Sequence, residues 1–256
     1  GGYNDESHNH NDAGHFIVYS NGRPAIIDVG VGRYTAQTFS ASRYDIWTMQ
    51  SAYHNLPLVN GFMQPHGKEF RAVVLGYSKT PGLSTLSLDL AAAYPDEAAV
   101  ERWERDIQLD RQNQLISVRD DYRLTRVIGD LQFILMTPCD VSVENHQLHL
   151  TGGLDPEKPV DLIVQFDSKL KTEVEKITLT DSRLKRIWGD HLNRICLIDT
   201  HPGNKDEVAL RIRQGFFCQY SSRNRETSYE PSGAFILLAG SGILPSPQHY
   251  QCTPPG

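Results

Sequence analysis

The sequence predicts an all-β protein built as a large antiparallel β-sandwich with very little helix. Short apolar or alternating segments recur along most of the 256 residues. Clusters of Gly, Pro, Asn and Asp separate them, and the 3.6-residue periodicity of helices is nearly absent. Regularly spaced short strands of this kind are typical of sandwiches. No clear linker interrupts the pattern, so we expect one domain over residues 1–256.

Two Asn-Gly pairs give the strongest local signals. Asn21-Gly22 separates the expected strands 15–20 and 23–28, and Asn60-Gly61 separates 56–60 from 62–64; Asn-Gly is the preferred pair in two-residue hairpin turns. One helix is expected, over 96–102 with Asp96 as its N-cap. The other expected strands cover 70–77, 83–92, 106–109, 114–119, 131–136, 147–151, 160–166, 175–180, 194–199, 207–214 and 234–239.

Composition and charge narrow the classes of partner. Hydrophobic residues make up 39% of the chain, enough for a packed core, and no apolar run approaches the ~18 residues of a membrane span. The net charge of −6 argues against nucleic acid. Residues 1–80 are neutral, with six basic and six acidic residues, and hold five of the ten His. We therefore expect any site for an anionic substrate in the first third of the chain.

Cysteines and the N-terminus give two further expectations. The four Cys (139, 196, 218 and 252) are widely spaced without a CxxC pair, and apolar neighbours favour buried thiols, although two disulfides remain open. The chain begins only a few residues before its densest motif. We interpret it as a fragment of a longer protein.

That motif is His8-Asn9-His10-Asn11-Asp12, with two imidazoles and a carboxylate within five residues. Asp28 ends an apolar strand, and His54 follows in Tyr53-His54-Asn55. Two neutral imidazoles and one carboxylate are a common ligand set for zinc and related metals. The sequence therefore predicts a metal site, against the ordinary alternative of a turn-capping Asp and unrelated His residues.

Spacing leaves the ligand choice open. A two-residue loop at Asn21-Gly22 would place Asp28 opposite His15. His10 lies five residues earlier, about 16 Å away in an extended chain, unless the turn-forming residues 11–14 bring it back. Either imidazole could therefore partner Asp28. Asp5, Glu6, Asp12 and Asn55 are the expected hydrogen-bond partners of the ligands.

His8 is the second group of chemical interest. On an extended segment it shares a face with His10, because side chains repeat every two residues. An imidazole beside a metal without binding it is well placed for proton transfer. The alternatives are a second metal ligand or a solvated loop residue.

Three ordered segments, 4–14, 27–35 and 51–55, resemble the C-terminal β-sandwich domain of the heparinase II/III-like polysaccharide lyases, which include heparin, heparan and alginate lyases. The resemblance covers residues 1–60. It implies an N-terminal (α/α) toroid that is absent from this chain, an active site between the two domains, and a periplasmic or secreted location. The isolated sandwich is then expected to be inactive.

The resemblance also implies residue roles. It selects His10 with Asp28 and His54 as ligands of a structural zinc, and it makes His8 a catalytic, substrate-facing residue. Tyr44 would add a catalytic phenol, and Arg43 would bind a uronate carboxylate; their ordinary alternatives are a strand aromatic and a solvated Arg.

The implied reaction is β-elimination on a uronic-acid polysaccharide, either a glycosaminoglycan or alginate. A base removes the proton at C5 and an acid protonates the leaving oxygen at C4, while the site neutralises the carboxylate. His and Tyr side chains suit these proton transfers.

Two other function classes compete. A cupin-like metal-dependent oxygenase or isomerase would use the same ligands with iron, but the late His residues (146, 149, 191, 201 and 248) lack a glycine-flanked motif. A carbohydrate-binding sandwich without catalysis would need exposed aromatic residues, and Trp47, Trp103 and Trp188 show no platform spacing.

Overall fold

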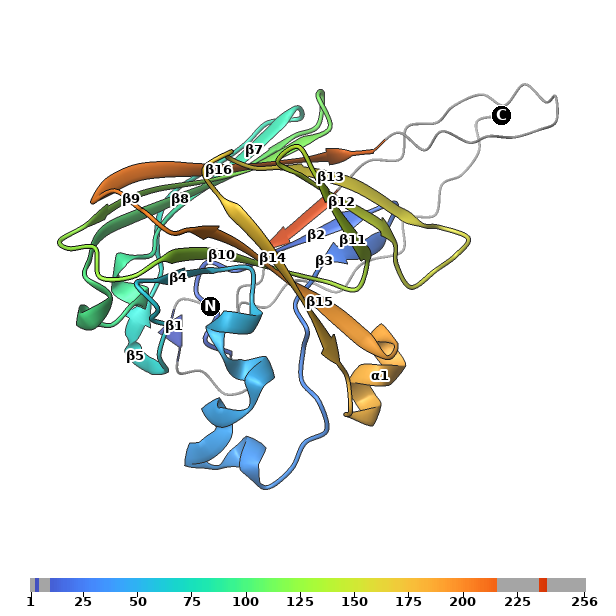
Figure 1. Ribbon diagram of the computed structural model, residues 1–256, viewed down its shortest axis with the longest axis horizontal. Coiled ribbons are helices and arrows are strands. Elements are labelled where there is room, and N and C mark those ends of the chain that lie inside the picture. The colour runs from blue at the N-terminus through green and yellow to red at the C-terminus, as the bar shows by residue number, and fades with distance from the viewer. Residues whose placement is uncertain (1–2, 5–9, 216–234, 239–256) are drawn as a thin grey trace.

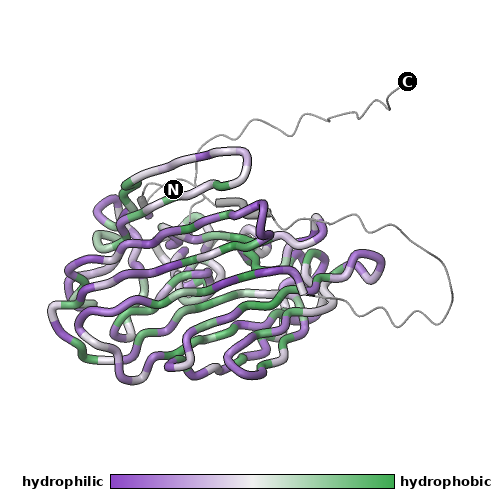
Figure 2. The backbone as a smooth tube through the Cα atoms, turned by 90° about the horizontal axis from the view of Figure 1, so that it is seen from above, coloured by the Kyte–Doolittle hydropathy of each residue, from purple (hydrophilic) through white to green (hydrophobic). Residues whose placement is uncertain are grey.

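The computed structural model describes residues 3–4, 10–215 and 235–238. Within these ranges the chain is mostly antiparallel strand, which confirms the predicted all-β sandwich (Figure 1). The long strands run side by side, and hydrophobic and hydrophilic stretches alternate across them (Figure 2). Among the described helices, none has the length and apolar character needed to cross a membrane.

Eight strands form the largest sheet. Along β8 and β9 alternate side chains are buried, so that Trp103, Ile107, Ile116 and Val118 enter the core while charged neighbours stay outside. The sheet order is β11 (Asp140–Glu144), β12 (Gln147–Gly152), β13 (Val160–Gln165), β16 (Lys205–Gln214), β9 (Leu115–Leu124), β8 (Val100–Asp110), β7 (Leu83–Asp89) and β6 (Val73–Lys79).

The four-stranded sheet lies between two hydrophobic cores. Phe133 and Leu135 of β10 face the large sheet, whereas Ile134 and Met136 face a second core that includes Leu184. A strand covered on both faces reads as a continuous apolar run, which explains the sequence of β10. The sheet order is β14 (Lys171–Thr178), β15 (His191–Asp199), β10 (Leu131–Thr137) and β4 (Pro57–Val59).

The hairpin predicted at Asn21-Gly22 joins β2 (Phe16–Ser20) and β3 (Arg23–Ile26). Both turn residues have positive φ, 53° and 73°, as a type I′ turn requires. A bulge between Val18 and Tyr19 shifts the register by one residue, and β3 ends at Ile26. The expected position of Asp28 opposite His15 is therefore wrong. β17 (Phe235–Leu238) completes this three-stranded sheet.

The expected helix over 96–102 is also wrong. Only Asp96–Ala98 forms a 3₁₀ turn, Ala99 adopts a left-handed conformation with φ 58°, and β8 begins at Val100. Pairing of β8 with β7 and β9 on either side outweighs the local capping signal.

Helical structure occurs in segments that show little of the 3.6-residue periodicity of helices. The four 3₁₀ helices η1 (Gln37–Phe39), η2 (Ala41–Asp45), η3 (Trp47–Met49) and η4 (Ser51–Tyr53) follow one another, and η5 (Ala91–Ala93) and η6 (Asp96–Ala98) lie further along. The α-helix α1 (Ser182–Trp188) is capped by Asp181 and is the only α-helix in the described part of the chain. Figure 1 places α1 and the η1–η4 segment on the same side of the four-stranded sheet.

Two more differences concern strands and cysteines. The expected strand 70–77 divides into β5 (Gly67–Arg71), which pairs with β1 (Tyr3–Asn4), and β6 in the large sheet, while β11 was not expected. Cys139 and Cys196 are buried free thiols, as expected, and the other two Cys lie outside the described residues.

Candidate metal centre

Four side chains converge beside the η1–η4 segment. One ligand atom from each of His10, Asp12, Asp28 and His54 lies within 4.8 Å of all the others. Nδ1 of His10 is 2.9 Å from Nε2 of His54. Oδ1 of Asp28 is 3.8 Å from the His10 nitrogen and 4.0 Å from the His54 nitrogen. The structure thus brings the three predicted ligands together and adds Asp12.

Local backbone contacts place the first ligands. Next to His10, the backbone N–H of Asn11 donates to the carbonyl of Met49 at 2.9 Å, which fixes the entry of this segment against η3. Asp28 follows β3, and its carboxylate accepts the N–H of Gly30 at 2.7 Å. Gly30 has φ +74°, a conformation that favours glycine and turns the chain back towards this carboxylate.

His54 is oriented by a second hydrogen bond. Its Nδ1 lies 2.9 Å from the carbonyl oxygen of Gln50, which can only accept, so Nδ1 carries the proton. Nε2 therefore presents its lone pair to the cluster. A carbonyl that fixes the ring in this way is the usual support of a metal-binding His.

The donor set fits a divalent cation of the zinc type. Zinc–nitrogen and zinc–oxygen bonds of about 2.0–2.2 Å place tetrahedral ligand atoms about 3.3–3.6 Å apart. The distances among the ligand atoms of His10, Asp28 and His54, which are 2.9, 3.8 and 4.0 Å, lie on both sides of this range. Two imidazoles and two carboxylates also supply a full set of four ligands. We expected Asp12 only as a supporting acceptor; its place within the 8–12 motif was the available signal.

Burial sets the protonation of these groups. Burial, with a smaller effect from neighbouring His54, lowers the pKa of His10 to about 4. Burial alone would raise the pKa of Asp28, but the surrounding imidazoles and the Gly30 amide outweigh it and lower the pKa to about 2. Burial raises the pKa of Asp12 to about 6. At neutral pH His10 is neutral and both carboxylates are ionised, as metal binding requires.

His15 lies beside the cluster but outside the ligand group. Its Nδ1 accepts the backbone N–H of Asn55 at 2.9 Å, and its ring packs edge-on against His54 with centroids 5.1 Å apart. Burial lowers its pKa to about 3. The group of converging ligand atoms therefore includes His10 beside Asp28 and does not include His15.

Asn55 connects the centre to both cores. Its side-chain amide donates to the carbonyls of Phe16 and Ile27 at 2.6 and 3.1 Å. Its side-chain oxygen accepts the backbone N–H of Met136 at 2.8 Å. One buried side chain thus joins β2, β10 and the segment leading to Asp28.

A buried ion pair contacts the two segments that carry Asp12 and His54. Arg105 and Asp120, both nearly inaccessible, form a two-point contact at 2.7 and 2.8 Å. Nη1 of Arg105 also donates to the carbonyls of Gly14 and Asn55, each at 3.1 Å. Asp120 additionally accepts from Nε1 of Trp103 at 2.8 Å. The pair therefore supports the chain just after Asp12 and just after His54; sequence reasoning missed it.

The expected substrate residues Arg43 and Tyr44 lie on η2, half-buried, so Tyr44 is not a strand aromatic. The Tyr44 ring stacks on His66 with centroids 4.4 Å apart, and the Arg43 guanidinium lies 5.9 Å from the Tyr44 centroid. Gln50 links them to the centre, since its amide donates to the Tyr44 carbonyl at 3.0 Å and its own carbonyl binds His54. His8 lies outside the described residues.

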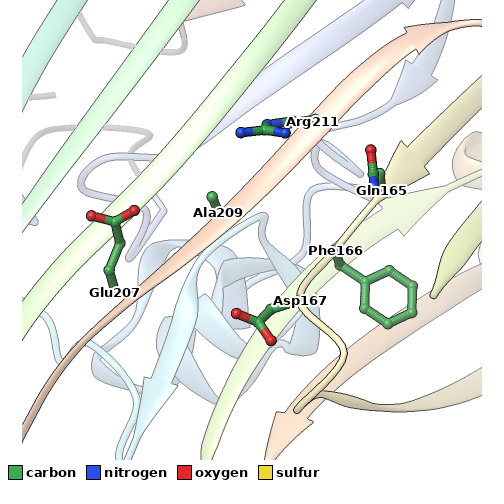
Figure 3. A pocket seen from close by; sticks show the side chains of 6 residues that line it. All are labelled: Gln165, Phe166, Asp167, Glu207, Ala209 and Arg211. Atoms are coloured by element: carbon green, nitrogen blue, oxygen red, sulfur yellow. The ribbon is translucent and has the colours of Figure 1, made fainter.

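A separate pocket of about 230 Å³ lies over β16 and the end of β13 (Figure 3). Its carboxylates already have partners: Glu207 accepts from Arg119 at 2.9 Å and Asp167 from the backbone N–H of Lys169 at 3.0 Å. None of the expected site residues lines it. The lining residues are Gln165, Phe166, Asp167, Glu207, Ala209 and Arg211.

Comparison with known families gives a match to the N-terminal half of the chain. Residues 1–121, which include all four members of the cluster, match the model of the family described as heparinase II/III-like, C-terminal. This match, together with the solved structures below, supports a C-terminal heparinase II/III-like domain. No curated protein matches the chain in sequence.

Solved structures share the fold of this heparinase II/III-like domain. A heparan sulfate lyase HepC mutant from Pedobacter heparinus aligns with a TM-score of 0.59 at 13% identity, over 80% of this chain and 31% of that one. Heparinase III aligns with a TM-score of 0.58 at 12% identity, over 90% of this chain and 34% of that one. This chain therefore spans about a third of the length of these two proteins.

Proposed function

We propose that this chain is the sandwich part of a polysaccharide lyase that cleaves a uronic-acid polysaccharide, glycosaminoglycan or alginate, by β-elimination. The observation that carries the proposal is the convergence of His10, Asp28 and His54 inside a heparinase II/III-like domain. Tyr44, whose backbone carbonyl is connected to His54 through Gln50, and the neighbouring Arg43 support it. The remaining machinery, in this proposal, belongs to an N-terminal toroid, and the enzyme acts in the periplasm or outside the cell.

The metal in this proposal is zinc, held by His10, Asp28 and His54 with Asp12 as a fourth ligand. When bound, the ion would stabilise the fold of the His8–Asp12 segment electrostatically and would have no free position for water activation. The chemical work then falls on side chains. This role suits a cluster whose four donors already come from the protein.

The proposed elimination uses this chain on the substrate side. Arg43 binds the uronate carboxylate, which spreads the negative charge that develops when the C5 proton leaves. A base takes that proton, the electron pair of the C5–H bond forms the C4–C5 double bond, and the C4–O bond breaks. His8 and Tyr44 take part in these proton transfers, one of which delivers a proton to the departing oxygen. The products are an unsaturated uronate and a new chain end.

Elemental analysis of the purified chain tests the metal assignment. We expect about one zinc per chain, lost in His10→Ala and Asp28→Ala together with a lower melting temperature. His201→Ala, an exposed His elsewhere, is the matched control and should keep its zinc. Unchanged metal content in both cluster variants would refute the site, and iron in the wild type would favour the oxygenase.

Turnover must be measured on the full-length protein, by the ultraviolet absorbance of the unsaturated uronate. We expect His8→Ala to abolish turnover while zinc content and melting temperature stay at wild-type values, because His8 is proposed to transfer a proton and not to bind the ion. Normal activity of this variant would show that His8 is not catalytic.

A further inference from the structure

An aromatic pair stands exposed on the segment between Asp28 and His54. Tyr34 and Phe39 are 46% and 69% exposed, and their rings stack with centroids 5.7 Å apart at an angle of 17°. The guanidinium of Arg183, from α1, lies over the Tyr34 ring at 5.6 Å. We call Tyr34, Phe39 and Arg183 the aromatic–arginine platform.

Hydrogen bonds tie the loop that carries Tyr34 to α1, although the two are far apart in sequence. The Asp181 carboxylate caps α1 through the N–H groups of Arg183 and Leu184, at 2.9 and 3.0 Å. It also accepts the N–H of Arg33 at 2.9 Å. A Cβ at Gly32 would lie 3.0 Å from this carboxylate, so a larger residue there would force Asp181 to shift.

A second tie fixes the other end of the helix. Nε1 of Trp188 donates to the carbonyl of Val29 at 2.8 Å, one residue from Asp28. The loop and α1 thus form one unit that is anchored beside the metal cluster. A rigid surface loses little entropy when a ligand binds to it, which is the usual property of a binding site.

The chemistry of the platform indicates its ligand. Apolar ring faces stack on the C–H faces of sugars, and an exposed guanidinium pairs with a carboxylate or sulfate. The only carboxylate next to Arg183 in sequence, that of Asp181, is occupied by three backbone N–H groups. Arg186, also exposed, follows one turn later on the same helix face. A basic aromatic surface on a chain of net charge −6 favours an acidic sugar.

We propose that the aromatic–arginine platform is a subsite that binds an acidic sugar residue of the polysaccharide, away from the residue that reacts. This inference rests on the proposed function for the identity of the polymer. Tyr34 lies six positions after Asp28, at most about 20 Å of extended chain, so one oligosaccharide can reach both places. Tyr34 and Phe39 lie within the residues that match the family model, whereas Arg183 on α1 lies beyond them.

Calorimetric titration of the whole chain tests the subsite. The probes are a heparan sulfate hexasaccharide and an alginate hexasaccharide, with neutral cellohexaose for comparison. We expect one acidic probe to bind, and Phe39→Ala or Arg183→Gln to weaken that binding about tenfold. The matched controls are Ile128→Ala, a 52% exposed aliphatic residue elsewhere, and Arg111→Gln, an exposed Arg on another turn; both should bind as the wild type does.

Each other outcome overturns the subsite. These outcomes are equal binding of the neutral probe, absence of binding of both acidic probes, unchanged affinity in Phe39→Ala, or self-association that depends on Phe39 without sugar binding. His10→Ala in the same titration separates the two proposals. Suppose that neither the wild type nor His10→Ala contains metal, that both bind the acidic probe, and that Phe39→Ala weakens this binding. The metal-site proposal then fails, whereas the subsite proposal stands.

Discussion

At the scale of single residues, the candidate centre depends on backbone groups that hydrogen-bond to the ligand side chains and so orient their lone pairs towards the cluster. The Gln50 carbonyl determines which nitrogen of His54 faces the cluster, and the Gly30 amide holds the Asp28 carboxylate. Residue types predicted a site of two imidazoles and one carboxylate but left His10 and His15 open, and only the family resemblance selected His10 with Asp28 and His54. The place of Asp12 was not predicted, because a turn decides whether its carboxylate points towards His10 or away.

Asn55 gives the prediction for this scale. Asn55→Ala leaves the carbonyls of Phe16 and Ile27 and the N–H of Met136 buried without their partner. Each such group costs about 1–3 kcal/mol, so we expect the free energy of unfolding in urea to fall by roughly 3 kcal/mol or more. Asn113→Ala, on an exposed turn, should change it by less than about 0.5 kcal/mol. Similar losses in the two variants would contradict this account.

At the scale of elements, local signals worked where the turn itself decides the structure. Asn21-Gly22 predicted its hairpin because few other residues adopt two consecutive positive φ angles. The expected helix at 96–102 failed because the decisive contacts come from β7 and β9. α1 was missed because seven residues with one buried side chain, Leu184, show no measurable periodicity. The bulge between Val18 and Tyr19 has no evident sequence signal, and it decides where Asp28 lies.

The Arg105–Asp120 pair gives the prediction for this scale. Arg105→Lys keeps the charge but cannot contact Asp120 and the carbonyls of Gly14 and Asn55 together, so the ligand segments lose their support. We expect zinc affinity, measured by competition with a chelator, to fall about tenfold or more. Arg102→Lys, in the partly buried surface pair with Asp121 on the same strands, should retain wild-type affinity. Lower stability with unchanged affinity would restrict Arg105 to a role in folding.

At the scale of the whole molecule, the fold class followed from strand spacing, whereas the arrangement of layers did not. Apolar runs such as β10 indicate burial but do not say that each face enters a different core. The candidate metal centre lies where the η1–η4 segment and the hairpin β2–β3 meet the four-stranded sheet, a place that only the assembled chain defines.

Acid stability gives the prediction for this scale. The folded-state pKa values of His10 and His15, about 4 and about 3, lie below the ordinary value of 6.5, so the unfolded chain takes up protons first as the pH falls. The stability that these two neutral imidazoles contribute is therefore fully present above pH ~6.5, and it decreases as the pH falls towards ~4. Asp12, whose pKa is raised to about 6, opposes this trend but is one group against two. Urea titrations of the chain, treated with a chelator to keep it metal-free, should show this decrease in the free energy of unfolding. A free energy of unfolding that stays constant between pH 6.5 and 4 would contradict it.

The shared strand β10 has a consequence for folding. Odd-numbered residues such as Phe133 serve one core and even-numbered residues such as Ile134 serve the other. A slip of a single residue against β15 would exchange the two sets at once and mismatch both sides of the sheet. Misaligned pairing of this strand is therefore penalised twice, and the correct alignment is selected even though nearly every side chain along it is apolar.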